Sequence, residues 1–406
     1  MNAHASPGAL TALSFSLLLA SLGTSIANVG LPSLVQVFSA TFEAVQWVVL
    51  AYLLAVTLAI VAAGRLGDRF GRRRLLLAGL LLFTLASALC GLAPSLGGLI
   101  AARALQGLGA AMMMAMTMAL VSDTVPKSHT GRAMGLLGTA SAVGTPLGPS
   151  AGGMLLGAFG WPALFFISVP LGLIALGLVH RWLHAAGQTG SRAGFSFRHA
   201  LGDRHLRAGM AMSGLVSAVM MATLMVGPFY LTHVTGLVPG WMGLTMAMGP
   251  CVSALSGVPA GRLTDRFGSR FVTRSGLLTM AVGCTLLLIA PQGLGVFGYL
   301  GPLVVLTLGY AQFQAANNTG VMSDVPADRR GVIAGLLNLS RNVGLMGGAK
   351  VLGAAFAWVA GDLADAAPHT ITTGMHATFA LALGLIGTAL LFARTTRPAT
   401  TPVTCG

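Results

Sequence analysis

The chain has 406 residues, of which 55% are hydrophobic and only 8% are charged, and its mean hydropathy is +0.83. Soluble domains carry about 25% charged residues, so this composition excludes an ordinary water-soluble protein and indicates an integral membrane protein. The charge balance is basic, with 23 Lys and Arg against 9 Asp and Glu, so the position of these charges must decide whether nucleic acid is a partner.

Apolar segments of roughly the length that crosses a hydrocarbon core recur along the chain, separated by short polar breaks. Because each backbone polar group must be satisfied within its own segment in lipid, every segment is expected to be an α-helix. The sequence therefore predicts an all-α integral membrane protein with twelve transmembrane helices. They cover residues 9–34, 43–62, 75–93, 97–121, 131–156, 163–182, 208–231, 239–260, 271–290, 297–322, 332–358 and 374–394.

The longest hydrophilic interruption, at residues 180–207, divides these helices into six and six. We expect an N-terminal six-helix bundle at 1–182 and a C-terminal bundle at 208–394. A cytoplasmic central loop at 183–207 would join them, and a cytoplasmic tail would follow at 395–406.

Basic residues fall almost entirely on one side of the predicted membrane. With the amino terminus inside, 20 of the 23 Lys and Arg lie in cytoplasmic connections and none in the connections on the other side. This positive-inside asymmetry predicts that both termini are cytoplasmic and that the protein lies in the cytoplasmic (inner) membrane. It also excludes a nucleic-acid partner, because the charge is spread over six connections and not gathered on one face.

The two halves repeat each other. GRLGDRFGRR at Gly64–Arg73 returns as GRLTDRFGSR at Gly261–Arg270, an offset of 197, and GRAMGLLGTASAVG at Gly131–Gly144 returns as GVIAGLLNLSRNVG at Gly331–Gly344, an offset of 200. Two parallel six-helix repeats are typical of secondary transporters, with a substrate site at their interface near the midplane.

Several of these motifs resemble the major facilitator superfamily, in particular its drug-efflux (drug:proton antiporter) branch. GRLGDRFGRRR is similar to the signature between helices 2 and 3, ARALQGLGAA (Ala102–Ala111) to the helix 4 signature, and GTPLGPSAGG (Gly144–Gly153) to the helix 5 signature of exporters. SLGTSIANVGLP (Ser21–Pro32), which includes Asn28, and QWVVLAYLLA (Gln46–Ala55) resemble helices 1 and 2 of drug antiporters with fourteen helices. The chain has room for the twelve-helix form, so the resemblance implies two pseudo-symmetric six-helix bundles, the major facilitator fold.

The charged motif and its repeat imply a cytoplasmic latch. The resemblance places Asp68 against a positive helix end and pairs Arg72 with Asp123, and the internal repeat extends the same roles to Asp265, Arg270 and Asp324. Such a latch would form when the transporter opens outward and break when it opens inward. The alternative is that these charges fix topology alone and need no partner.

The fifth segment carries a predicted hinge. Glycines four apart allow close helix contact and the prolines favour a kink, although a merely well-packed helix is the simpler interpretation. The residues are Gly144, Pro146, Gly148, Pro149, Gly152 and Gly153.

Three basic residues, Arg103, Arg341 and Lys350, lie inside predicted helices, where an ionisable group is a candidate for function. The resemblance gives Arg103, with Gln106 one turn on, a place near the proton-coupling path. Arg341 is expected to meet a polar cluster, although plain helix–helix hydrogen bonding would account for the same residues. The predicted coupling and cavity residues are Arg103, Gln106, Asn28, Arg341, Gln312, Gln314, Asn317 and Asn338. Lys350 can snorkel and is expected to be structural.

None of the nine acidic residues falls in the middle of a predicted helix, and Gly23 stands where similar antiporters carry an Asp in helix 1. A cavity with Arg and no acid disfavours cations, so we expect neutral or anionic amphipathic substrates. Methionines four apart, such as Met221 and Met225, suggest core packing first, then a polyspecific pocket, and last a thioether site for Cu(I).

The sequence thus predicts a secondary active transporter that exports small amphipathic compounds by alternating access, coupled to proton influx, and that works as a monomer. The alternatives are an importer of a metabolite or Cu(I), and a membrane sensor that moves nothing. Four scattered cysteines, no nucleotide-binding loop and no nucleophile constellation predict no metal site, no cofactor and no enzyme activity.

Overall fold

The computed structural model describes residues 7–124, 130–183, 204–323, 325, 330–361 and 366–395. Every regular element in these ranges is helical, and they hold no β-strand. The first half consists of α1 (Pro7–Val29), α3 (Phe42–Phe70), α4 (Arg72–Gly91), α5 (Leu96–Thr124), α6 (Thr130–Phe159) and α8 (Ser168–Trp182). The second half consists of α10 (Arg204–Phe229), α11 (Pro239–Phe267), α12 (Ser269–Ile289), α13 (Gly295–Ser323), α14 (Arg330–Ala360) and α15 (Pro368–Thr395).

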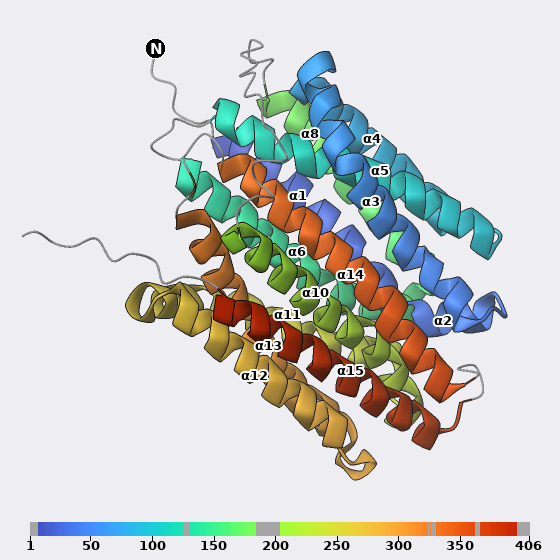
Figure 1. Ribbon diagram of the computed structural model, residues 1–406. Helices are drawn as coiled ribbons and strands as arrows, with labels where there is room; N and C mark the ends of the chain where they lie inside the picture. Colours follow the sequence, from blue (N-terminus) through green and yellow to red (C-terminus); the bar gives the residue numbers. More distant parts are fainter. Residues whose placement is uncertain are drawn as a thin grey trace, which may run out of the picture.

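These twelve long helices confirm the predicted fold of two pseudo-symmetric six-helix bundles. Eleven carry a stretch long and apolar enough to cross a membrane, and α6 offers the shorter apolar stretch Leu147–Phe159. In Figure 1, α4 and α5 lie on one flank and α12 on the other, with α1, α6, α10 and α14 between them. Most of the predicted central loop, residues 184–203, lies outside the described residues, as does the tail from residue 396.

Two predicted helices are interrupted in the structure. The first ends at Val29, and a separate short helix, α2 (Leu31–Val37), follows with Pro32 in its first turn. Proline lacks the N–H that would continue the helix hydrogen-bond pattern, which explains the break. The seventh ends as a π-helix, Tyr230–Val234, directly after Pro228 inside α10.

The repeated charged motif makes the same tight turn in each half. Gly71 joins α3 to α4 with φ of 94°, and Gly268 joins α11 to α12 with φ of 81°. Residues with a side chain rarely adopt these angles, so each glycine is required by the turn. These turns mark one end of the bundle, here called the basic end, where Arg65–Arg74, Arg262–Arg274 and Arg394 lie.

The predicted hinge segment is a glycine face that packs α6 against α1. A Cβ on Gly144, Gly148 or Gly152 would meet Leu18, Ser25 or Ile26, all on α1. The second half repeats this packing 200 residues later, where Gly344 and Gly348 of α14 lie against Gly214 and Ala218 of α10. The side chain of Pro146 lies outside what the structure describes. The stripe is therefore an interface within each half, and its hinge role stays a prediction.

Gly153 makes a different contact, because it joins the two halves. A Cβ on Gly243 of α11 would lie 2.5 Å from the Cα of Gly153 and 2.5 Å from the carbonyl oxygen of Pro149. Helices α6 and α11 therefore meet backbone to backbone, which only two glycines permit.

Gly243→Ala should destabilise the protein by about 1–3 kcal/mol, because its methyl group would overlap the backbone of α6. The matched control is Gly257→Ala on the same helix, where a Cβ meets nothing within 4 Å. That control should be neutral or stabilising, since alanine is the better helix former. Thermal unfolding in detergent measures both, and equal midpoints for the two variants would contradict the backbone contact.

Candidate functional site

Arg103 is the largest fully buried side chain and ties three helices together. Its Nε donates to the carbonyl oxygen of Val48 on α3 at 2.9 Å, and its Nη1 donates to that of Gly23 on α1 at 3.1 Å. Nη1 also donates to the side-chain oxygen of Gln106, one turn along α5. Backbone and amide oxygens thus take the place of a carboxylate around this charge.

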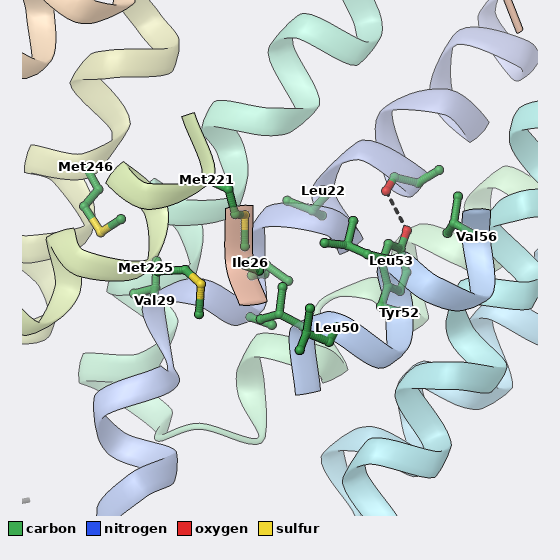
Figure 2. Packing of buried hydrophobic residues seen from close by; sticks show 14 of the residues in the cluster. Leu22, Ile26, Val29, Leu50, Tyr52, Leu53, Val56, Met221, Met225 and Met246 are labelled. Atoms are coloured by element: carbon green, nitrogen blue, oxygen red, sulfur yellow. Dashed lines mark hydrogen bonds between the residues drawn. The ribbon is translucent and has the colours of Figure 1, made fainter. Parts of the chain in front are cut away.

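Aromatic faces complete the surroundings of Arg103. Its guanidinium carbon lies 4.3 Å from the ring centre of Tyr52 and 5.8 Å from that of Phe165, both within cation–π range. The Tyr52 hydroxyl donates in turn to the carbonyl oxygen of Ala20 at 2.8 Å. Figure 2 shows Tyr52 within the apolar cluster. The Nη2 of Arg103 is buried and finds no hydrogen-bond partner among the described residues.

Gly23 explains how the arginine fits without an acid. A Cβ at Gly23 would lie 3.1 Å from the Tyr52 hydroxyl and 3.2 Å from the Phe83 ring. A side chain at this position would crowd the two aromatic residues beside the carbonyl oxygen that accepts from Arg103. The predicted coupling residues Arg103 and Gln106 bond to each other, and the Nε2 of Gln106 donates to the hydroxyl oxygen of Ser87 of α4 at 2.7 Å. Their role in coupling stays a prediction.

The second half has no counterpart of this charge. The offsets of 200 and 197 residues place Leu303 at the position of Arg103 and Gly249 at that of Tyr52. These two counterparts pack together, with a Cβ on Gly249 lying 3.4 Å from Leu303. The fold is duplicated, but the buried cation is not.

Gln46 is a contact between the halves that sequence reasoning missed. Its buried Nε2 donates to the carbonyl oxygen of Ala349 on α14 and approaches the sulfur of Met225 at 3.8 Å. Gly353 makes room for it, because a Cβ there would meet the Gln46 amide. The offsets of 197 and 200 relate Gln46 to Gly243 and Gly353 to Gly153, so the two crossings between the halves are equivalent. A comparison of these offsets in the sequence could have indicated that Gln46 and Gly353 lie at corresponding contacts.

Aromatic side chains close the same region of the interface. Phe42 of α3 lies 5.2 Å from Phe229 of α10 and 6.0 Å from Phe356 of α14, measured between ring centres. Figure 2 shows the adjoining apolar contacts, where Met221 and Met225 of α10 lie near Ile26 and Leu50 of the first half. Both methionines are buried, so they pack the core here, and the Cu(I) alternative stays untested.

The close contacts between the halves are not repeated toward the basic end in the described part of the chain. Gly64, Gly261 and Gly335 each lie 18 residues from Gln46, Gly243 and Gly353 on their own helices, which is five helical turns and so the same helix face, about 27 Å away. Among the described residues, nothing lies within 4 Å of a Cβ on any of these three glycines. Within the ranges that the structure describes, the contacts made at Gln46, Gly243 and Gly353 are therefore not repeated at the basic end.

Arg341 lies on the part of α14 between its contacts with α10 and α3. Ser340 bonds to Met210 of α10, and Gly344 packs on the same helix, whereas Ala349 faces α3. At about 100° per residue, Arg341 is about 60° from Gly344 on the side toward Ala349. It is half-buried, and the described residues give it no hydrogen bond or ion pair.

Among the residues of the predicted polar cluster around Arg341, a hydrogen bond is seen for Asn317 but joins it to the backbone of α10. Asn317 is buried and donates to the carbonyl oxygen of Gly209 at 3.2 Å, which is helix–helix bonding between α13 and α10. Gln312, Gln314 and Asn338 are half-buried. Asn28 is buried on α1 and donates to the carbonyl of Ser25 at 3.1 Å, and its own oxygen has no partner among the described residues.

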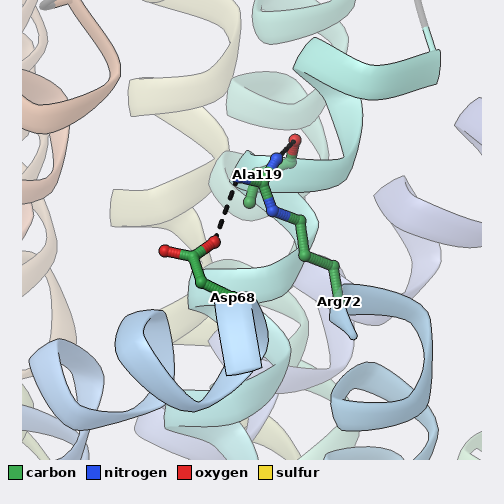
Figure 3. A network of polar contacts seen from close by, with 3 residues as sticks. All are labelled: Asp68, Arg72 and Ala119. Carbon is green, nitrogen blue, oxygen red and sulfur yellow. Dashed lines mark hydrogen bonds and ion pairs between the residues drawn. The ribbon is translucent and has the colours of Figure 1, made fainter. Parts of the chain in front are cut away.

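Two residues of the first predicted latch bond to each other within the first half, whereas the predicted pairing of Arg72 with Asp123 stays a prediction. Nη2 of Arg72 lies 3.2 Å from Oδ1 of Asp68, and Nη1 donates to the carbonyl oxygen of Ala119 near the end of α5 at 3.3 Å (Figure 3). Asp68 is exposed, so this ion pair contributes little to stability by itself. The side chain of Asp123 and all of Asp324 lie outside what the structure describes.

Arg270 occupies a different place from Arg72. The offset of 197 makes it the counterpart of Arg73, and both cap the end of a helix: Arg73 donates to His180 of α8 at 3.1 Å, and Arg270 to Arg394 of α15 at 3.4 Å. Asp265 is exposed, and the described residues give it no ion pair. The pairing of Arg270 with Asp324 stays a prediction.

Comparison with known proteins decides the family. The sequence profile of the Major Facilitator Superfamily matches residues 13–349, which is most of the chain. This chain belongs to the Major Facilitator Superfamily. It is therefore a multi-pass secondary transporter and not an enzyme.

Curated relatives and solved structures agree with this assignment. The chain is 27% identical over 390 residues to the riboflavin transporter RibZ of Clostridioides difficile, covering 84% of this chain and 86% of the relative. It is 28% identical over 412 residues to the multidrug resistance protein Stp of Mycobacterium tuberculosis, covering 87% and 76%. The crystal structure of a bacterial homologue of the human lysosomal transporter Spinster, inward-facing and unoccupied, superposes with a TM-score of 0.82 at 18% identity, covering 97% of this chain and all of that one.

Gln106→Leu should lower the stability of this transporter by about 1.5–3 kcal/mol, because it removes an acceptor from a buried, charged guanidinium. The control Ser87→Ala removes only the outer, neutral bond and should cost about 0.5–1.5 kcal/mol. Unfolding in detergent gives both values. A larger loss for Ser87→Ala than for Gln106→Leu would contradict the central place of Arg103.

Asp68→Asn should leave stability within about 1 kcal/mol, because its ion pair is exposed. If Asp68 belongs to the latch, transport in vesicles should nevertheless fall by at least about fivefold, the range of a typical coupling energy. The control is Glu43→Gln, an exposed acid at the other end of α3. Unchanged transport in Asp68→Asn would contradict the latch and would indicate that the charges of this motif only determine topology.

Proposed function

We propose that this transporter exports small neutral or anionic amphipathic compounds across the cytoplasmic membrane by alternating access, coupled to proton influx. In this proposal both termini are cytoplasmic, the chain acts as a monomer, and the basic end faces the cytoplasm because positive charge favours that side. The multidrug resistance relative supports export, whereas the riboflavin transporter supports small amphipathic substrates without deciding direction.

The conformation fits an early step of such a cycle. Gln46, Phe42 and the Gly153–Gly243 contact hold the halves together at the end away from the basic turns. The described residues make no such contact at the basic end, so we interpret the structure as open to the cytoplasm, ready to accept a compound for export. The Asp68–Arg72 pair and its proposed partners would close that end later in the cycle.

The observation that carries the substrate class is Arg341, which has no hydrogen bond or ion pair with the described residues. Its half-buried guanidinium lies at membrane depth, and the described parts of the spans contain no carboxylate in the middle of a helix. An uncompensated cation attracts anionic groups and repels cationic ones over the short distances of a substrate site. Nε and Nη1 of Arg103 are bonded to α1, α3 and Gln106 within the first half, so we assign Arg103 and Gln106 to coupling and not to substrate binding.

Arg341→Gln should reduce export of a carboxylated fluorescent dye by about tenfold, the effect of losing about 1.4 kcal/mol of binding. Export of the uncharged methyl ester of the same dye should stay unchanged. The measurement uses inverted and right-side-out proteoliposomes, with and without a pH gradient. Lys350→Gln is the matched control, since Lys350 is exposed on the same helix.

Three outcomes would overturn parts of this proposal. Rapid transport of ethidium by the unaltered protein would exclude the anionic preference. An equal loss of export for the dye and for its ester in Arg341→Gln would show that Arg341 has a structural role and does not bind the substrate. Transport that ignores the pH gradient would exclude proton coupling.

A further inference from the structure

Two arginines of α12 stand side by side at the end of α15. Nη2 of Arg270 donates to the carbonyl oxygen of Arg394 at 3.4 Å, and Nη2 of Arg274 donates to that of Ala393 at 3.3 Å. Because they bond to consecutive carbonyls and lie one helical turn apart, the two guanidiniums are neighbours. Both side chains are half-buried, and the Nε–H of each is buried without a hydrogen-bond partner among the described residues.

Positive charge at this junction exceeds the negative charge that the structure describes. The end of an α-helix carries the equivalent of about half a negative charge, which offsets only part of two guanidiniums. Arg394, in the last turn of α15, adds a third. Among the described side chains no carboxylate lies within 4 Å of Arg270 or Arg274.

The first half shows that helix capping does not require both arginines. There Arg73 alone caps α8 through His180, and Leu77 stands at the position of Arg274. The same junction is thus built with one arginine in the first half and two in the second. Arg274 therefore needs an explanation beyond the packing of α12 against α15.

The surroundings of the pair point to lipid. Phe271, Leu278 and Val282 form an exposed apolar stripe along α12, with exposed fractions of 60%, 55% and 53%. At 100° per residue, Arg274 lies about 60° from Phe271 and about 40° from Leu278, so the guanidinium stands beside this stripe. The arginine pair at the basic end would bind the anionic head of an amphipathic molecule, and the apolar stripe beside it would contact the apolar chains.

We propose that Arg270 and Arg274, together with the end of α15, bind the phosphate of an anionic phospholipid whose acyl chains lie along Phe271, Leu278 and Val282. Two adjacent guanidiniums can each donate to a different oxygen of one phosphate, which is a strong, charge-assisted arrangement. Basic pockets between transmembrane helices on the cytoplasmic side are known to hold such headgroups. The site is separate from Arg341 and independent of the transported compound.

Native mass spectrometry of the full chain in detergent tests this site. Dioleoyl phosphatidylglycerol should bind as a discrete adduct, and Arg274→Leu should weaken it by at least about tenfold, while Arg274→Lys retains part of it. Arg262→Leu removes an exposed arginine from the same end of the bundle and should leave binding unchanged. Thermal unfolding with and without the lipid gives a second readout, in which Arg274→Leu stays folded but loses the lipid-dependent stabilisation.

Control ligands separate lipid from phosphate and from an internal partner. Dioleoyl phosphatidylcholine should bind weakly, and millimolar inorganic phosphate should not displace phosphatidylglycerol. Asp324→Asn should change the affinity by less than about twofold, whereas a large gain would identify Asp324 as the counterion of the pair and overturn the proposal. Equal phosphatidylglycerol binding by Arg274→Leu and the unaltered protein, or full displacement by inorganic phosphate, would also overturn it.

Discussion

Contact between helix backbones is the interaction on which this structure depends. In hydrocarbon the apolar side chains gain little from leaving lipid, so helices associate where small residues let their backbones approach. Glycines of α6 and α14 make such faces against α1 and α10 within each half. Gly153 and Gly243 make one between the halves. The same short list of glycines therefore determines how each bundle is built and how the two bundles meet.

A buried charge is accommodated on this framework without an opposite charge. Arg103 is held by carbonyls of α1 and α3, by Gln106 and by the faces of Tyr52 and Phe165. Gly23 leaves room for the Tyr52 hydroxyl and the Phe83 ring beside the α1 carbonyl. The second half fills the same place with Leu303 against Gly249. The two halves thus share the same scaffold, whereas the buried arginine stands in the first half alone.

Much of this architecture could be predicted from local sequence, because lipid restricts a span to one structure and charge orients it. The twelve spans, the two glycine turns of the charged motifs and the Arg103–Gln106 pair all depend on residues close together in the chain. Partners on distant helices could not be predicted in this way. The glycine stripe of α6 did not indicate that Gly152 contacts α1 whereas the next residue, Gly153, contacts α11. Arg270 looked like Arg72 by its motif, and only the strict offset relates it to Arg73.

The two crossings between the halves have different physical consequences for alternating access. Gly153 and Gly243 touch through van der Waals contact alone, so separating them leaves no polar group without a partner. Gln46 bonds to the carbonyl oxygen of Ala349, and its own Oε1 is already without a partner among the described residues. Opening that crossing in a dry interface would leave a buried amide and carbonyl unsatisfied, at about 1–3 kcal/mol each. In the proposed cycle water or substrate must therefore reach Gln46 as this end opens, which makes the Gln46 crossing the more costly of the two to break.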